Sequence, residues 1–155
     1  MTKIPTQILF VCTGNTCRSP MAEFVMKYLV RKAGLEEKIY VASAGCSVPE
    51  GKDISKGTRG ILEKYEIPFE ERKSVQFTAA DYDAYDYIVG IDSGNVEGIL
   101  EIAGGDPKGK VHLLMEFTGE AREVNDPFAT KNYDKTYEDI LEGCKSLLDE
   151  LHLKP

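Results

Sequence analysis

The sequence has 155 residues, of which 42% are hydrophobic and 29% charged, and its formal net charge is −7. This length and composition suit a globular protein with one hydrophobic core, so we expect a single domain over residues 1–155. The acidic balance argues against a nucleic-acid-binding protein, which needs a basic surface, and no apolar run approaches the roughly 18 residues that span a bilayer. The N-terminal segment Met-Thr-Lys-Ile-Pro lacks the apolar core of a secretory signal, which predicts a cytoplasmic protein.

Short apolar runs predict the strands of a buried sheet. Each run is bounded by turn-forming residues, which favours a strand over part of a helix. Four such runs occur in the sequence, at residues 7–11, 39–42, 87–91 and 111–115.

Helical patterns lie between and after these runs. The first helix is expected to begin at Pro20, with Ser19 as its N-cap, and to end at Gly34. Further helices are expected over 55–66, 78–85 and 96–102, and a long loop is expected around Asn125-Asp126-Pro127. In the last helix one apolar stripe is formed by Ile140, Leu141, Cys144, Leu147, Leu148 and Leu151.

The alternation of strands and helices predicts the fold class. A strand that is followed by a helix and then by another strand is typical of a parallel sheet. Such a sheet is covered by helices on both faces. We therefore expect an α/β protein with three layers and a doubly wound parallel sheet.

The loop after the first strand lies where α/β proteins bind ligands, at the carboxyl end of a strand. Residues 12–18, CTGNTCR, lead directly into the first helix. Backbone N–H groups of such a loop, together with a helix N-terminus, form a site for phosphate. Gly14 and Asn15 are the residues best suited to the positive φ of a tightly curled loop.

Cys12 and Arg18 add chemistry to this anion site. A helix N-terminus and a nearby arginine favour the reactive thiolate form of a cysteine, and a guanidinium can hold two phosphate oxygens at once. Together they predict attack of the Cys12 sulfur on phosphorus, which gives a cysteinyl-phosphate. The alternative is a buried cysteine and a helix-capping arginine, since this spacing also occurs by chance.

The cysteines also bear on metal and redox chemistry. Without a signal peptide, Cys12, Cys17, Cys46 and Cys144 are expected to be free thiols. No second pair with the spacing of zinc ligands accompanies them, so no metal site is expected. Cys17 is either a small apolar residue beneath the loop or a thiol that protects Cys12 by trapping its oxidised form as a disulfide.

The segment CTGNTCRSPMAE, residues 12–23, resembles the CxGNxCRSPxAE loop of the low-molecular-weight protein tyrosine phosphatases. Asp126-Pro127 resembles the downstream Asp-Pro of that family, and the order of elements is similar over essentially the whole chain. The resemblance implies a four-stranded parallel sheet in the order 2-1-3-4. It also implies hydrolysis of phosphotyrosine on phosphorylated proteins, without a cofactor.

The resemblance implies a role for each matching residue. Cys12 is the expected nucleophile, Arg18 the phosphate-binding arginine and Asp126 the general acid. Three supporting residues are expected, and these are Ser19 beside the thiolate, Ser43 beside the loop asparagine and Asp92 in the turn after the third strand. Contacts with phosphate or substrate are expected from Thr13, Gly14, Asn15, Thr16, Cys17 and Phe128.

Two of the chain's departures from the family pattern concern the loop and the choice of substrate. Many members carry a histidine that hydrogen-bonds the loop asparagine, where this chain has Arg72. Phosphotyrosine enzymes often have an aliphatic residue at the position of Thr16, whereas a threonine there resembles the related protein arginine phosphatases. The turn that contains Asp92 and Asn95 is typical of tyrosine phosphatases, so phosphotyrosine is the preferred prediction and phosphoarginine the alternative.

Two other classes of protein share part of this pattern. The thioredoxin-coupled arsenate reductases share this loop but need two more cysteines near the third strand, and residues 82–90 contain none. A non-catalytic phosphopeptide-binding module would keep the anion site, yet binding alone requires neither Cys12 nor Asp126. The oligomeric state is not predicted.

Overall fold

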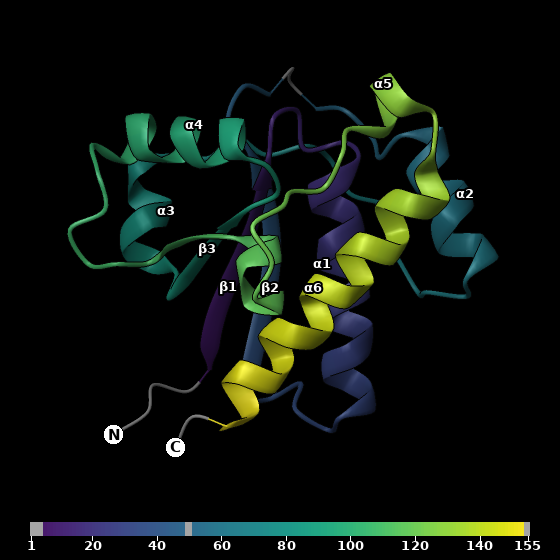
Figure 1. The fold of residues 1–155 in the computed structure, drawn as a ribbon, viewed down its shortest axis with the longest axis horizontal. Coiled ribbons are helices and arrows are strands. Elements are labelled where there is room, and N and C mark those ends of the chain that lie inside the picture. The colour runs from purple at the N-terminus through teal and green to yellow at the C-terminus, as the bar shows by residue number, and fades with distance from the viewer. Residues whose placement is uncertain (1–4, 49–50, 154–155) are drawn as a thin grey trace.

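The computed structural model describes residues 5–48 and 51–153, so residues 1–4, which carry most of the N-terminal segment used to predict location, lie outside it. The strands are β1 Thr6–Cys12, β2 Ile39–Gly45, β3 Tyr87–Gly90 and β4 Val111–Leu113. The helices are α1 Arg18–Lys32, α2 Lys56–Lys64, α3 Ala79–Ala84, α4 Ser93–Ala103, the 3₁₀ helix η1 Leu114–Thr118, α5 Pro127–Thr130 and α6 Tyr133–Leu153 (Figure 1).

Within the described residues the strands form one four-stranded sheet in the order β2-β1-β3-β4. Every neighbouring pair is parallel. This confirms the strand order that the family resemblance implied. The carboxyl ends of the strands meet at one edge of the sheet, the upper edge in Figure 1, where the loop after β1 and α5 also lie.

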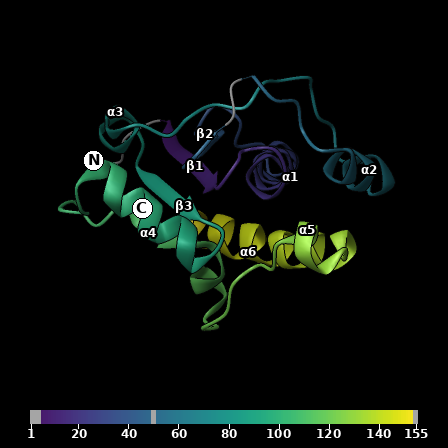
Figure 2. The ribbon, with the colours of Figure 1, turned by 90° about the horizontal axis from the view of Figure 1, so that it is seen from above.

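The alternation of side chains along β1 supplies two separate cores. Ile8 and Phe10 are fully buried in the core that includes residues of α1 and α6. Leu9 and Val11 point to the other face, where they pack with residues such as Ile99 of α4. Figure 2 shows α3 and α4 on one side of the strands and α1, α2 and α6 on the other. The three-layer prediction is therefore confirmed, and both faces of the sheet are dry.

The start of α1 differs from the prediction. The helix begins at Arg18, and Cys17 occupies the N-cap position without a side-chain cap hydrogen bond. Ser19 lies inside the first turn, where its hydroxyl contacts Cys12 and Asn15 instead. The predicted Ser19 N-cap is wrong because a tertiary partner takes the hydroxyl that a cap would use.

The segment that follows β4 also differs from the prediction. The strand predicted to reach Met115 ends at Leu113, and the chain turns into η1, where the Glu116 carboxylate accepts a hydrogen bond from the Leu113 amide (2.7 Å). Leu114 and Met115 are fully buried, but they belong to η1 and not to the strand. The expected loop before α6 contains the short helix α5, which the sequence prediction missed.

The apolar stripe predicted in α6 is confirmed. Ile140, Cys144 and Leu147 are fully buried in the core shared with α1. Cys144 is thus a core residue, and its burial raises the pKa of the thiol far above its ordinary value. No helix in the described ranges combines the length and apolar character needed to cross a membrane.

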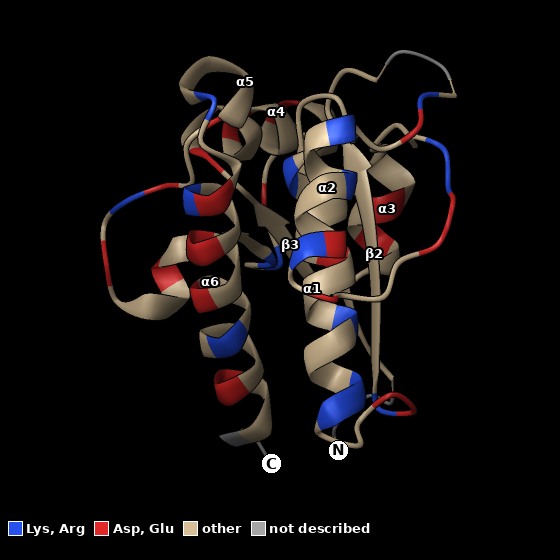
Figure 3. Cartoon of the chain, turned by 90° about the vertical axis from the view of Figure 1, so that its right-hand side faces the viewer, with Lys and Arg blue, Asp and Glu red and all other residues tan. Residues whose placement is uncertain are grey.

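Charged residues are distributed over the helices on the α1 side of the sheet. Figure 3 shows bands of both signs on α1, α2 and α6. One pair joins two of these helices, since Lys64 Nζ at the end of α2 lies 2.6 Å from Asp134 Oδ1 at the start of α6. This contact holds the start of α6 against the end of α2.

Candidate active site

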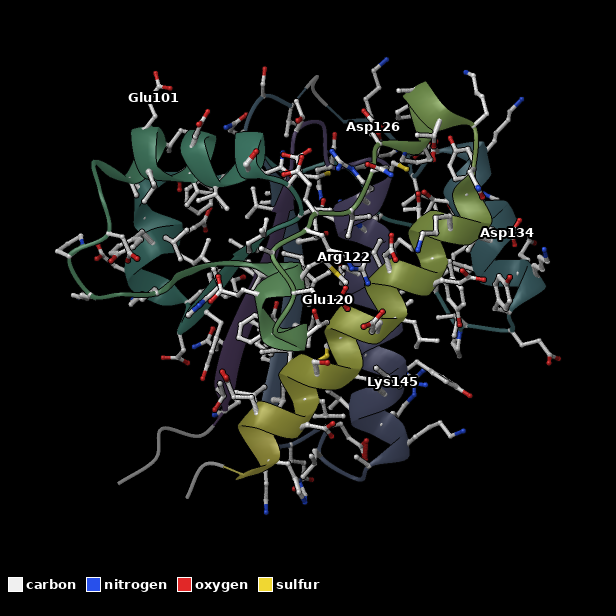
Figure 4. All side chains as sticks on the ribbon, in the orientation of Figure 1. Glu101, Glu120, Arg122, Asp126, Asp134 and Lys145 are labelled. Atoms are coloured by element: carbon white, nitrogen blue, oxygen red, sulfur yellow. The ribbon has the colours of Figure 1, made fainter. Side chains whose placement is uncertain are left out.

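The loop after β1 surrounds a cavity of about 230 Å³ at the carboxyl edge of the sheet. Asp126, labelled in Figure 4, lies at the same edge, although it is far from this loop in the sequence. The cavity is lined by Cys12, Thr13, Gly14, Thr16, Cys17, Arg18, Asp126 and Phe128. The structure therefore brings together the residues for which a substrate or catalytic role was expected, with Asn15 behind the lining.

Asn15 sets the shape of the loop. It has φ 56°, in the left-handed region, and its side chain is completely buried. Its Nδ2 donates to Ser19 Oγ (2.9 Å) and to Ser43 Oγ (3.0 Å), and its Oδ1 accepts from the amide of Val75 (2.8 Å). Asparagine tolerates this conformation, and its amide is held from both ends. Gly14 has no positive φ, so the expectation for that glycine is wrong.

Ser19 connects Asn15 to the cysteine. Its Oγ lies 2.9 Å from Cys12 Sγ and 3.2 Å from the carbonyl of Ala44. Because Oγ accepts a hydrogen bond from Asn15, its single proton is available for one of these two acceptors. A hydroxyl proton directed at sulfur stabilises the thiolate relative to the thiol.

Ser43 extends the same network away from the cavity. Its hydroxyl donates to Glu23 Oε1 (2.6 Å), and Lys27 Nζ donates to Glu23 Oε2 (2.6 Å). Glu23 belongs to the matching loop segment, but the sequence analysis assigned it no role. Its carboxylate is buried and ion-paired, so it fixes Ser43 as a donor that cannot turn away from its partners.

Arg18 is buried and held in one orientation by two acceptors. Its Nη2 lies 2.9 Å from Asp92 Oδ2, and its Nη1 donates to the carbonyl of Val124 (2.7 Å). These bonds use two of the five N–H groups of a guanidinium and leave three for a ligand. Asp92 thus contacts Arg18, while its Oδ1 accepts from the Asn95 amide at the start of α4 (2.8 Å), and its supporting role stays a prediction.

Arg72 occupies the place of the expected histidine. Its Nη1 donates to the main-chain oxygen of Asn15 (2.9 Å), and its Nη2 donates to Asn15 Oδ1. Burial lowers the pKa of this guanidinium, while the nearby Glu23 and Cys12 raise it, and arginine stays charged in proteins. The sequence marked this position as a departure, but only the structure shows that the hydrogen bond to the loop is retained.

We expect Arg72→Met to lower kcat/KM on an aryl phosphate by about 10- to 100-fold, because charged hydrogen bonds of about 1.5–3 kcal/mol to the loop are lost. The affinity for inorganic phosphate should fall in parallel. Lys73→Met is the matched control, since Lys73 is the next residue and forms an exposed ion pair with Asp53. Equal kinetics for the two variants would contradict a role of Arg72 in holding the loop.

Two further residues that the sequence analysis left without a role hold the loop from its neighbours. Asn95 Nδ2 donates to Thr13 Oγ1 (3.2 Å), which joins the turn after β3 to the loop. A Cβ at Gly45 would lie 2.6 Å from the Thr13 oxygen and 2.9 Å from the Asn15 nitrogen. Only glycine allows β2 to approach the loop so closely.

Cys17 lines the cavity but is buried. Burial raises the pKa of its thiol to about 11, and its carbonyl accepts a hydrogen bond from Thr58 Oγ1 (3.2 Å). The thiol is therefore protonated at neutral pH, and a protonated thiol is a poor nucleophile. This favours the packing interpretation, while protection of Cys12 through a disulfide stays a prediction.

Asp126 is exposed at the mouth of the cavity. It caps α5, where its Oδ1 accepts from the amide of Phe128 (3.0 Å). Its Oδ2 has no partner in the part of the chain that the structure describes, so this oxygen can carry and transfer a proton. The segment before it is tied to α6 by Arg122, which is labelled in Figure 4; its Nη1 lies 2.8 Å from Asp139 Oδ1 and its Nη2 lies 2.8 Å from Glu142 Oε1.

The model of the low molecular weight phosphotyrosine protein phosphatase family matches residues 7–154. The chain belongs to this family. A curated low molecular weight phosphatase, the protein-tyrosine-phosphatase PtpA of Staphylococcus aureus (strain MRSA252), is 38% identical over 144 residues, which cover 92% of this chain and 91% of PtpA.

Solved structures are also similar to this chain. The crystal structure of YfkJ from Bacillus subtilis is 33% identical, with a TM-score of 0.92 and coverage of 98% of each chain. A variant of the YwlE arginine phosphatase with a phosphorylated active-site serine is 28% identical, with a TM-score of 0.87 and coverage of 96% of this chain and 97% of that one. The similar proteins thus include both a tyrosine and an arginine phosphatase.

Proposed function

We propose that this protein hydrolyses phosphotyrosine on phosphorylated proteins through a cysteinyl-phosphate on Cys12. The observation that carries the proposal is the contact of Ser19 Oγ with Cys12 Sγ at 2.9 Å, at the base of the cavity lined also by Arg18 and Asp126. A hydroxyl at hydrogen-bond distance from the sulfur can turn its proton to a thiolate, which supports a nucleophilic cysteine beside the guanidinium of Arg18 and the carboxyl group of Asp126.

In the first step the substrate phosphate lies on the backbone amides of the loop. The three free N–H groups of Arg18 hold its non-bridging oxygens. The Cys12 thiolate attacks phosphorus, and a phosphorus–sulfur bond forms as the phosphorus–oxygen bond to the leaving group breaks. Asp126 donates its proton to the departing oxygen, so that a neutral phenol leaves.

In the second step Asp126 acts as a base. Its carboxylate takes a proton from a water molecule, whose oxygen attacks phosphorus in the cysteinyl-phosphate. The phosphorus–sulfur bond breaks, and the thiolate returns to its place beside the Ser19 hydroxyl. Inorganic phosphate then leaves, and Asp126 is again protonated for the next cycle.

The substrate class depends on the mouth of the cavity. Phe128 lies at this mouth with 51% of its surface exposed, and an exposed aromatic ring can pack against a tyrosyl ring. A comparison of kcat/KM on phosphotyrosine and phosphoarginine peptides tests the choice. We expect the phosphotyrosine peptide to react faster, and the opposite ranking would establish the alternative, a protein arginine phosphatase.

Thr16 is the candidate selector between these substrates, because its half-buried side chain lines the cavity. We expect Thr16→Ile to lower kcat/KM on phosphoarginine more than on phosphotyrosine, by about tenfold in the ratio. A hydroxyl can hydrogen-bond a guanidino group or order a water, whereas isoleucine offers only apolar surface. An unchanged ratio of the two kcat/KM values would show that another residue selects the substrate.

Three broader proposals accompany the activity. The chain acts as a single domain, requires no cofactor and works in the cytoplasm, where its substrates are phosphorylated proteins. A non-catalytic phosphopeptide-binding module is the remaining alternative. Rapid mixing with an aryl phosphate separates the two, because an enzyme with a cysteinyl-phosphate intermediate releases the phenol continuously, whereas a binding module releases none.

A further inference from the structure

Helix α2 contains two glycines, Gly57 and Gly60, although glycine weakens a helix. The structure gives these two glycines different surroundings. A Cβ at Gly60 would meet no atom within 4 Å. A Cβ at Gly57 would lie 2.1 Å, 2.2 Å and 2.6 Å from the Cζ, Cε1 and Cε2 atoms of Tyr133. The tyrosine ring therefore lies directly against the backbone of Gly57, in space that no other residue type would leave open.

Tyr133 is the first residue of α6 and follows the segment that carries Asp126. Burial raises the pKa of its phenol above the ordinary value. The ring thus packs on the first turn of α2 from the first residue of α6.

The first turn of α2 is bonded to the phosphate-binding loop. The Ser55 amide donates to the carbonyl of Thr16 (2.7 Å), and Thr58 Oγ1 donates to the carbonyl of Cys17 (3.2 Å). Gly57 lies between these two contacts in the chain. A displacement of the Tyr133 ring from Gly57 is therefore also a displacement of the ring relative to the phosphate-binding loop.

The start of α6 is in turn bonded to the segment that carries Asp126. Thr136 Oγ1 lies 3.4 Å from the carbonyl of Asn125, the residue immediately before Asp126, and 3.2 Å from the carbonyl of Asn132, so its one proton is directed at these two acceptors. Asp134 accepts hydrogen bonds from Lys64 (2.6 Å) and from the Tyr65 hydroxyl (2.8 Å), and Figure 4 shows it between α6 and α2. The start of α6 is thus held against both ends of α2.

We propose that the contact of Tyr133 with Gly57 sets the distance between Asp126 and the phosphate-binding loop, which makes Tyr133 a positioning residue for proton transfer. The proposal rests on the function proposed above. A methyl group at Gly57 needs about 3.5 Å to a ring carbon, so the ring must retreat by more than about 1 Å. A shift of this size in a proton donor is sufficient to lower the rate by orders of magnitude.

The test compares Gly57→Ala with Gly60→Ala on two substrates. Phenyl phosphate has a poor leaving group that needs protonation, whereas dinitrophenyl phosphate has a good one. We expect Gly57→Ala to lower kcat/KM on phenyl phosphate by about 10- to 100-fold and on dinitrophenyl phosphate by less than about twofold, because kcat/KM reports the step in which the leaving group departs. Gly60→Ala should match the wild type on both substrates, and phosphate affinity should be unchanged in both variants.

Substitutions of Tyr133 keep the proposal testable if Gly57→Ala fails to fold. Tyr133→Phe should keep most of the rate on phenyl phosphate because the ring stays on Gly57. Tyr133→Ala should lose that rate selectively, and Gly57→Ala added to it should cost nothing more, since the ring is gone. The same loss on both substrates, or no loss with Tyr133→Ala, would overturn the proposal. A wild type without turnover would instead refute the proposed function.

Discussion

Cys12→Ser should abolish turnover and leave the binding of inorganic phosphate. The new hydroxyl is a far weaker nucleophile than a thiolate at neutral pH, so we expect kcat below about 10⁻³ of the wild-type value. Phosphate affinity depends on the backbone amides and on Arg18, which Asp92 and the Val124 carbonyl hold in place without Cys12. Phosphate affinity by calorimetry and steady-state kinetics on an aryl phosphate measure the two effects separately.

Cys46→Ser is the matched control for this experiment. Cys46 follows β2 and its Sγ lies 3.6 Å from the carbonyl of Asn95, but it does not line the cavity. Its burial raises the pKa of its thiol to about 11, so the thiol is protonated at neutral pH, and this variant should keep wild-type kinetics. Retention of a few per cent of activity in Cys12→Ser would refute the covalent mechanism.

Asp126→Asn should lower kcat/KM by about 10²–10⁴-fold on an aryl phosphate with a poor leaving group, which is the usual contribution of general acid–base catalysis. An asparagine keeps an oxygen that can accept the hydrogen bond from the Phe128 amide, so α5 should remain capped and the loop in place. The loss should be much smaller on dinitrophenyl phosphate, whose leaving group needs no proton.

Glu120→Gln is the control for this carboxylate. Glu120 belongs to the same segment and pairs with Arg122, away from the cavity lining. It should therefore show the kinetics of the wild type on both substrates. If Asp126→Asn slows the two substrates equally, Asp126 does not protonate the leaving group.

The sequence by itself determined the fold class and the centre of the site. The runs at 7–11, 39–42 and 87–91 identify strands because their apolar character and their turn-forming flanks are local properties of the chain. The segment from Cys12 to Arg18 is equally local, since a strand, a curled loop and a helix follow one another without a gap. Such features need no distant partner, and the sequence therefore predicts them before any packing is known.

Tertiary structure alone decided how the loop is held and how Asp126 reaches it. The hydrogen bonds of Arg72 to Asn15, the ion pair of Arg18 with Asp92 and the ring of Tyr133 on Gly57 join residues that are far apart in the chain. A charged or aromatic residue has many possible partners, and only the packing of helices against the sheet selects one of them. For the same reason the Ser19 hydroxyl, which by local rules would cap α1, instead contacts Cys12 across the loop.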